Sequence, residues 1–429
     1  MSIPIYNSKT INTQVLERLM QRSVANYDAV KAEIKPSMDA VNKFGDAAIL
    51  KKYRDRCIPV SKLKISKAEF DEAYQNCDSR FLQAFKVARR NLEKVCKAQM
   101  KSAHNTCVVN SKGIKVWREW RPLDSIGIYA PGGRANYPST LLMCAIPAII
   151  AGCKRIIACA PPNEQGKLPA ELLVTASELG ICGVFKVGGA QAIAAMAYDT
   201  KSITKVLKIV GPGNQYVTAA KLLVFPQTAI DLPAGPSENL IIADDSANPD
   251  CVAADLITDA EHGPDSTSIL LTPSEEVAKN VSLLVAKLLK DLSTRETIIE
   301  SLTNYGAIIV TQSLDEAISL ANEYAPEHMQ IMTRNPTTIA KRIVNAGSVF
   351  VGPWSAKAAG DYATGANHVL PTGQAARTFG ALSVESFGKW IEFQQLTKSG
   401  FTQLSQTIET YADIEGLPAH ELSSAVRNI

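Results

Sequence analysis

The stretch LKIVGPGNQYVTAAK, residues 207–221, joins a short apolar run to a glycine turn and then to a helical pattern. Similar runs of β-branched and apolar residues recur from residue 124 to residue 352, separated by helical stretches of about 10–18 residues. This alternation is typical of βαβ units and of a mostly parallel sheet. Residues 11–53 and 67–100 instead carry apolar side chains at spacings of three and four, which predict helices. The last fifty residues, from about 383, show the same helical spacing, and we predict helices without strands there.

The composition is that of an ordinary globular protein. The chain has 429 residues, enough for two or three compact units of about 150 residues each. It carries 45 Lys and Arg against 42 Asp and Glu without charge blocks, so we expect neither nucleic acid nor a membrane as a partner. The longest apolar run, residues 141–153, is too short to span a bilayer. The N-terminus lacks a secretion pattern and the nine cysteines include no Cys-x-x-Cys pair, so we expect a cytoplasmic protein.

Three glycine turns follow predicted strands, at residues 129–134 (YAPGGR), 187–191 (VGGAQ) and 210–214 (VGPGN). Each precedes a helical pattern, so bare backbone N–H groups and a helix N-terminus would face a ligand there, an arrangement that favours phosphate. None completes the G-x-G-x-x-G pattern, and any one of them could be an ordinary strand-to-helix turn. Three such turns at the carboxyl ends of strands in one α/β region favour a nucleotide-binding crevice.

Four of the five histidines lie beside carboxylates or special turns, and His104 stands alone in a polar stretch. The four are His262, His328, His368 and His420. Asn248-Pro249 predicts the start of a helix and Gly263-Pro264 its end, which would place Asp259 and His262 on one helical face. Asp255, Asp259 and Glu261 would then lie near the negative end of the helix dipole. Either these acids are solvated on a surface helix, or a cation is bound beside them.

Glu327 and His328 are adjacent, directly after Pro326 and after a helix that we expect to begin at Ser313. A carboxylate and an imidazole offer two proton acceptors of different basicity, which suits general base catalysis near neutral pH. Adjacent Glu and His also occur by chance, so this pair alone does not decide a function.

Eight stretches of the chain resemble the histidinol dehydrogenase family. They are YAPGGRANYPST (129–140), GGAQAIAAMAY (188–198), VGPGNQYVTAAK (210–221), DLPAGPSE (231–238), AEHGPDS (260–266), APEH (325–328), GDYATGANHVLPT (360–372) and EGLPAH (415–420). The resemblance covers nearly the whole chain and is densest from residue 125 to residue 420. That family oxidises L-histidinol to L-histidine in two steps, with two NAD⁺ and a bound zinc ion, so the resemblance implies this activity here.

The resemblance also implies roles for particular residues. It implies NAD contacts at Tyr129, Gln191 and Asn214. It implies one zinc ion per subunit, held by His262, Asp361, His420 and whatever residue stands at position 259. Substrate binding is implied for Ser237, Asp259, His262, His328, Asp361, Glu415 and His420. Glu327 and His328 would be catalytic: His328 would take the hydroxyl proton while hydride leaves to NAD⁺, and Glu327 would activate water to attack the bound aldehyde.

With the resemblance, we predict two Rossmann-like domains with parallel sheets and helical extensions. Residues 1–25 would form an N-terminal helical extension, and residues 26–128 with 239–382 a first α/β domain that carries the metal and catalytic residues. Residues 129–238 would form the second domain, on the NAD side, and residues 383–429 a C-terminal helical extension. In a homodimer this extension would place Glu415 and His420 in the partner's site. The alternative is that it packs on its own chain.

One position departs from the family pattern. The family usually has Gln immediately before its AEHG motif, where this chain has Asp259. Two aspartates and two histidines around Zn²⁺ would be formally neutral, and we expect weaker Lewis acidity or a preference for ions such as Mn²⁺. The departure leaves room for a relative that oxidises another small alcohol, for example a sulfonated diol. Outside the family, the alternatives are an NAD-independent metallohydrolase and a catalytically inactive binding or scaffold protein.

Overall fold

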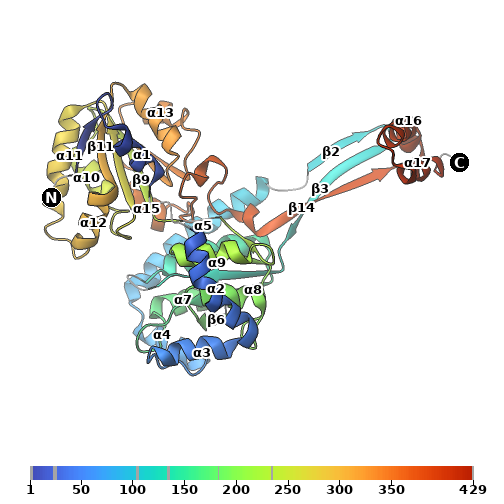
Figure 1. Cartoon of the computed structure of the whole chain (residues 1–429), viewed down its shortest axis with the longest axis horizontal. Helices are drawn as coiled ribbons and strands as arrows, with labels where there is room; N and C mark the ends of the chain where they lie inside the picture. Colours follow the sequence, from blue (N-terminus) through green and yellow to red (C-terminus); the bar gives the residue numbers. More distant parts are fainter. Residues whose placement is uncertain are drawn as a thin grey trace.

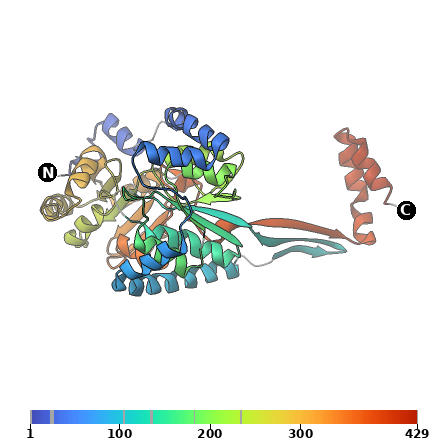
Figure 2. The same cartoon turned by 90° about the horizontal axis from the view of Figure 1, so that it is seen from below.

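Two lobes and one long arm make up the molecule (Figure 1). The computed structural model describes residues 3–22, 27–102, 106–132, 136–181, 183–232 and 235–427. The arm leaves the body as a narrow ribbon of strands and ends in two helices, α16 (Lys398–Ile414) and α17 (Pro418–Ala425) (Figure 2).

The first lobe is built on a six-stranded sheet in which every strand pair is parallel. In spatial order its strands are β1 (Ile5–Asn7), β11 (Gly306–Val310), β10 (Thr267–Thr272), β9 (Glu238–Ala243), β12 (His328–Met332) and β13 (Ser348–Val351). All residues of β9, β10, β11 and β12 are buried, as expected where helices cover both faces of a parallel sheet.

Two groups of helices cover this first sheet. One face packs against α10 (Pro249–Leu256), α11 (Glu275–Leu288) and α12 (Arg295–Tyr305). The other packs against α1 (Thr13–Gln21), α13 (Leu314–Tyr324) and α14 (Pro336–Ala340). The predicted N-terminal helical extension therefore contains a helix, but it also contributes β1, which pairs with β11 at the edge of the sheet.

The second lobe repeats the same strand order on a smaller scale. Its five parallel strands are, in spatial order, β6 (Gly183–Lys186), β5 (Arg155–Ala160), β4 (Ser125–Tyr129), β7 (Lys208–Val210) and β8 (Ala229–Ile230). In each sheet the strands follow one another outward in both directions from a central strand, β4 in the second lobe and β9 in the first, and β1 is added beside β11 at the edge of the first sheet. This is the doubly wound arrangement, so the prediction of two Rossmann-like parallel sheets is confirmed.

The long N-terminal helices belong to the second lobe. One face of its sheet packs against α4 (Lys67–Asn76), α5 (Ser79–Ser102), α6 (Pro138–Ala151) and α7 (Ala170–Glu178). The other packs against α2 (Tyr27–Phe44), α3 (Asp46–Asp55), α8 (Ala190–Tyr198) and α9 (Gln215–Val224). The predicted grouping of residues 26–128 with residues 239–382 differs from this packing. The reason is that the apolar stripes of α2 and α5 cover the second sheet.

The arm is a three-stranded antiparallel sheet in the order β14 (Gly388–Leu396), β3 (Ile114–Pro122) and β2 (Thr106–Ser111). The prediction of helices without strands after residue 383 is therefore wrong for β14. Aromatic pairs across the strands stabilise it: the rings of Trp117 and Phe393 stack at 5.3 Å, and Trp120 meets Trp390 edge to face. The remaining elements are α15 (Lys357–Tyr362) and two short 3₁₀ turns, Ala375–Arg377 and Val384–Phe387.

Two further features of the described ranges are the hydropathy of the helices and the state of the thiols. Within those ranges, no helix combines the length and the hydropathy needed to cross a bilayer. Seven cysteines in the described ranges form no disulfide: Cys57, Cys77, Cys96, Cys144, Cys153, Cys159 and Cys251.

The glycine turn after β7 is held tightly against the end of β4. Gly211 has φ +113, and a Cβ placed there would collide with the backbone carbonyl oxygen of Tyr129. We expect Gly211→Ala to lower the free energy of unfolding by about 2–5 kcal/mol, because left-handed strain and overpacking add. Gly180→Ala is the matched control: Gly180 has φ +73 but no atom within 4 Å of its virtual Cβ, and strain alone costs about 1 kcal/mol. Equal losses in urea unfolding would show that the Tyr129 contact is unimportant.

Candidate active site

A cavity of about 670 Å³ lies between the two lobes, and residues from both line it. The second lobe contributes the turns after β4 and β7, with Tyr129, Gly132 and Asn214. The first lobe contributes Glu327 and His328, which lie at the start of β12. The cavity therefore joins the carboxyl edge of one parallel sheet to the amino edge of the other.

Glu327 and His328 are placed by the end of α13 and by a reciprocal contact with β9. Ser313 caps α13 as predicted, and Ala325 ends the helix in a left-handed conformation. The backbone N–H of Glu327 donates to the Glu238 carboxylate at 3.2 Å, and the backbone N–H of Glu238 donates to the Glu327 carboxylate at 3.0 Å. Each acid thus accepts the other's backbone hydrogen bond, which fixes both side chains at the sheet edge.

Arg22 forms a buried ion pair with Glu238, the partner of Glu327. Its guanidinium lies 3.0 Å from the Glu238 carboxylate and 3.7 Å above the ring of Tyr324, and both charged side chains are buried. Gly373 also donates its backbone N–H to Glu238 at 2.7 Å. Burial raises the pKa of Glu238, and Arg22 opposes that shift. The sequence analysis missed Arg22 and Glu238, although Glu238 ends the DLPAGPSE stretch.

His328 has one ring nitrogen engaged and one open. Nδ1 lies 3.1 Å from the Glu238 carbonyl oxygen and 3.1 Å from an Asp259 carboxylate oxygen. Nε2 is buried and has no hydrogen-bond partner among the described residues, and its nearest acid is Asp361, at 3.8 Å. When Nδ1 carries the proton, Nε2 is the acceptor that can take a proton from a molecule in the cavity.

The buried charges around this pair shift both pKa values upward. Burial raises the pKa of Glu327 to about 8, although the positive charge of His328 opposes it. Burial alone would lower the pKa of His328, but the carboxylates of Asp259 and Glu327 outweigh burial and raise it to about 9. Near neutral pH the pair therefore holds protons that an acid and an imidazole in water would release.

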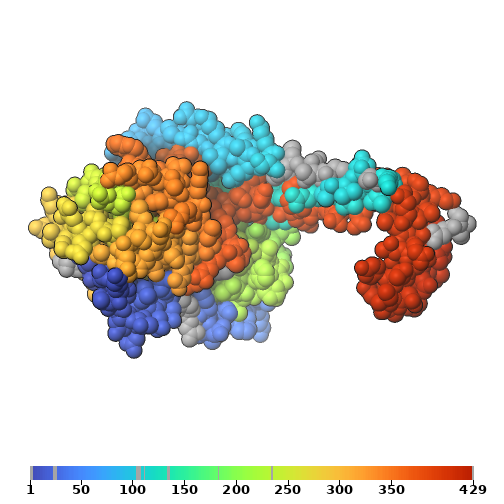
Figure 3. All heavy atoms as spheres, turned by 90° about the horizontal axis from the view of Figure 1, so that it is seen from above, coloured from blue at the N-terminus to red at the C-terminus, as the bar shows by residue number. Residues whose placement is uncertain are grey.

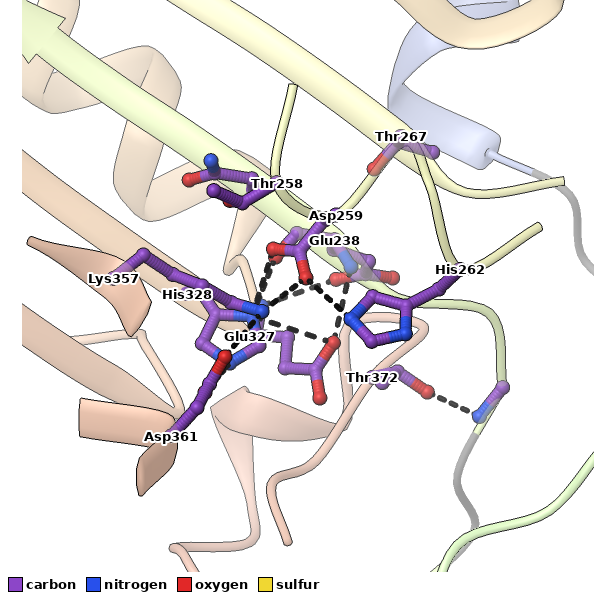
Figure 4. Close-up of polar contacts among 12 residues, drawn as sticks. Glu238, Thr258, Asp259, His262, Thr267, Glu327, His328, Lys357, Asp361 and Thr372 are labelled. Atoms are coloured by element: carbon purple, nitrogen blue, oxygen red, sulfur yellow. Dashed lines mark hydrogen bonds and ion pairs between the residues drawn. The ribbon is translucent and has the colours of Figure 1, made fainter. Parts of the chain in front are cut away.

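A lysine lies at the centre of the predicted metal site. The Lys357 ammonium is 2.6 Å from one oxygen of Asp259 and 2.8 Å from one oxygen of Asp361 (Figure 4). Lys357 begins the six-residue helix α15, is only 2% exposed and reaches Asp361 one helical turn later. Burial would lower the pKa of Lys357, but the two carboxylates outweigh it and raise the pKa, so the amine stays charged.

Three of the four predicted zinc ligands come together, but they do not fit a zinc ion as arranged. His262 lies 3.8 Å from the same Asp259 oxygen that Lys357 contacts. Zinc would need oxygens of Asp259 and Asp361 at about 2.0–2.2 Å, and the ammonium occupies the space between them. Among the described residues, no three His, Cys, Asp or Glu side chains converge as a metal site.

The segment that carries Asp259 and His262 is a turn and not a helix. The predicted start at Asn248 is confirmed, but α10 ends at Leu256 rather than at Gly263. The Asp255 carbonyl oxygen accepts from the Asn239 amide and from the Thr258 hydroxyl, both at 2.7 Å. These side chains occupy the acceptor that the next helical turn would need, and the helix therefore stops.

The predicted NAD residues are divided. Tyr129 and Asn214 line the cavity, and Asn214 also caps α9 by accepting from the N–H groups of Tyr216 and Val217. Gln191 is not among the lining residues, since its side-chain oxygen accepts a hydrogen bond from Lys52 at 2.6 Å. The glycine turns that begin at Tyr129, Val187 and Val210 do follow β4, β6 and β7 at their carboxyl ends, as expected, and residues 133–134 of the first turn lie outside the described ranges.

Comparisons with known proteins indicate the same family over nearly the full length of the chain. The sequence model of the family described as "Histidinol dehydrogenase" matches residues 20–428. The histidinol dehydrogenase of Methanothermobacter thermautotrophicus is 43% identical over 407 residues, 94% of this chain and 95% of that protein. That of Vibrio cholerae is 43% identical over 98% of this chain and 96% of its own length. The chain belongs to the histidinol dehydrogenase family. It is an oxidoreductase of that family.

A solved structure shares the architecture. The crystal structure of histidinol dehydrogenase from Elizabethkingia anophelis superposes with a TM-score of 0.93 at 38% identity, covering 99% of this chain and 98% of that one. The two-lobed body and the extended arm therefore belong to the histidinol dehydrogenase fold.

Two predicted site residues lie far from the cavity of their own chain. Glu415 follows α16 and His420 lies in α17, both at the exposed tip of the arm (Figure 1). Ser237 lines the cavity, and so does His368, which the sequence analysis singled out without assigning a role. Within this single chain, the cavity is thus lined without Glu415 and His420.

We expect Arg22→Met to lower the free energy of unfolding by about 3–5 kcal/mol, because it leaves the buried Glu238 carboxylate without its cation. The double variant Arg22→Met/Glu238→Gln should recover at least about 1 kcal/mol relative to the sum of the single losses, since it removes both charges. Urea unfolding of the four proteins measures this coupling. Additive losses would show that the Arg22–Glu238 pair does not stabilise the catalytic edge of the sheet.

Proposed function

We propose that this chain oxidises L-histidinol to L-histidine through L-histidinaldehyde, in two hydride transfers to NAD⁺, as the last steps of histidine biosynthesis. The observation that carries this proposal is the buried Glu327–His328 pair, which shares one cavity with the glycine turns of the second lobe. Relatives named histidinol dehydrogenase, similar over nearly their whole length, support the choice of substrate.

The chain's own residues can divide the reaction between them. We assign Tyr129, Gln191 and Asn214 to NAD binding, where bound NAD⁺ accepts hydride; Gln191 would have to leave Lys52 to reach the cofactor. In its deprotonated form, which becomes more abundant as the pH approaches its raised pKa of about 9, His328 takes the hydroxyl proton of the alcohol on Nε2, because its Nδ1 is held by Glu238 and Asp259. The deprotonated form of Glu327, whose pKa is raised to about 8, then takes a proton from the water that attacks the aldehyde. Binding in the cavity between the lobes keeps the aldehyde oriented and away from side reactions.

The product count tests this proposal. With L-histidinol and NAD⁺ we expect about two NADH per histidine, because the aldehyde stays bound for the second oxidation.

His328→Gln should lower kcat by about 10²–10⁴, the usual contribution of a positioned base. Glu327→Gln should slow oxidation of supplied L-histidinaldehyde more than oxidation of the alcohol. Glu323→Gln, at an exposed position on the preceding helix, is the control. One NADH per product would mean that the aldehyde escapes, and turnover of a sulfonated diol instead would reassign the substrate.

We further infer a cytoplasmic homodimer in which the arm reaches a second copy of the chain. The two C-terminal helices stand away from the body (Figure 3). Large apolar side chains are exposed on these helices and at their ends: Tyr411, Ile414, Leu417, Leu422 and Val426. Apolar side chains gathered on one projecting element mark an interaction surface. Glu415 and His420 lie on the same element, so a partner that covers it receives both residues near its own cavity.

Mixed dimers test the shared site. We combine a His328→Ala chain with a His420→Ala chain by refolding them together. If each tip serves the partner, half of the dimers have one intact site, and about a quarter of wild-type activity returns. Each variant refolded alone serves as the control and should stay inactive. If His420 instead serves its own chain, the mixture remains as inactive as the single variants.

A further inference from the structure

The Asp259–Lys357–Asp361 group is a closed set of ion pairs inside the active-site cavity. All three side chains are buried, and Lys357 lines the cavity between the two acids. The ammonium has three N–H donors, and two of them point at carboxylate oxygens 2.6 and 2.8 Å away. One donor is left for a molecule in the cavity.

The carboxylate of Asp259 supplies the negative charge that the buried Lys357 ammonium needs. A buried ammonium needs compensating negative charge, which a neutral Gln amide cannot supply. The carboxylate of Asp259 is the closer of the two partners of Lys357, at 2.6 Å against 2.8 Å for Asp361. The buried lysine therefore depends on an acid at position 259.

A dication cannot share the same oxygens with the ammonium. Zinc and Lys357 would both need Asp259 and Asp361, and two cations on the same pair of carboxylates repel each other strongly in a buried site. Lys357 has little room to withdraw, because its whole side chain is buried at the start of α15.

We propose that the Lys357 ammonium is the resident cation of this site, that it takes the place of zinc, and that its third N–H binds the hydroxyl oxygen of the substrate. In the oxidation the C–H electron pair and hydrogen leave as hydride to NAD⁺, the O–H proton goes to His328, and the carbonyl oxygen stays hydrogen-bonded to Lys357. The reaction part rests on the proposed function, whereas the absence of a zinc site does not.

Zinc binding by the full-length protein tests whether Lys357 takes the place of zinc. After dialysis against a chelator, we titrate Zn²⁺ alone by calorimetry and measure bound metal by mass spectrometry. Wild type should hold clearly less than one zinc per chain. Lys357→Gln, which frees both carboxylates, should bind one zinc at least about tenfold more tightly than wild type. Lys357→Arg keeps the charge and should resemble wild type, and Lys357→Gln/His262→Ala should lose the gained affinity. Lys221→Gln is the matched control. It also removes a buried lysine from a buried carboxylate, that of Asp231, but no histidine in the described ranges forms a charge pair with Asp231, so no zinc should bind there.

Wild type that keeps one zinc per chain against the chelator overturns the proposal, as does a Lys357→Gln variant that folds by circular dichroism but binds zinc no more tightly. The wild-type measurement decides the matter even if Lys357→Gln fails to fold.

Turnover separates this proposal from the proposed function. With L-histidinol and NAD⁺, wild-type kcat should be unchanged by chelator, and Lys357→Gln should lose about 10²–10³ in kcat while Lys357→Arg loses less. Loss of wild-type activity in chelator with recovery on adding zinc overturns the lysine as resident cation. If no preparation forms NADH, the proposed function fails, and the zinc titration still decides whether the site takes a metal.

Discussion

The structure depends on the compensation of charges that are buried together at the edge of one sheet. Glu238, Asp259, Glu327 and Asp361 lie in a small volume with Arg22, His328 and Lys357, and each acid has a cation within 4 Å. Unpaired, any of these groups would cost several kcal/mol to bury. Burial raises the pKa of Glu327, so that acid can hold a proton, and the remaining three acids then match the three cations. A divalent ion added to this balanced set would leave two positive charges in excess.

The strand directions in the two sheets explain why the acids and the glycine turns face each other. Parallel strands gather the turns after β4 and β7 at the carboxyl edge of the second sheet, where open α/β sheets bind ligands. In the first sheet the catalytic pair lies at the opposite, amino edge, since β9 begins at Glu238 and β12 at His328. Neither lobe alone contains a complete site, and the reciprocal Glu238–Glu327 hydrogen bonds keep the catalytic edge in register.

Local patterns predicted much of this, and long-range contacts explain what they missed. The glycine turns, the caps at Asn248 and Ser313 and the adjacency of Glu327 and His328 are encoded within a few residues. Strand β14 escaped prediction because its aromatic residues are stabilised by partners in β3, more than 260 residues earlier. Arg22 meets Glu238, and Lys357 meets Asp259, only in the folded chain. The one local signal for Lys357 was its i,i+4 spacing from Asp361.

The contact with Lys357 gives Asp259 a role that differs from that of a metal ligand. As a metal ligand it would only adjust the charge of a zinc site. Beside a buried ammonium it is required, since a single Asp361 would leave the lysine partly uncompensated and would leave His328 without its closest acid. A neutral substitution of Asp259 or of Lys357 alone would leave the other buried charge less compensated, so the effects of the two substitutions should not be additive. An ammonium is also fixed covalently to the chain, so a site built this way carries its cation whatever metal the solution contains.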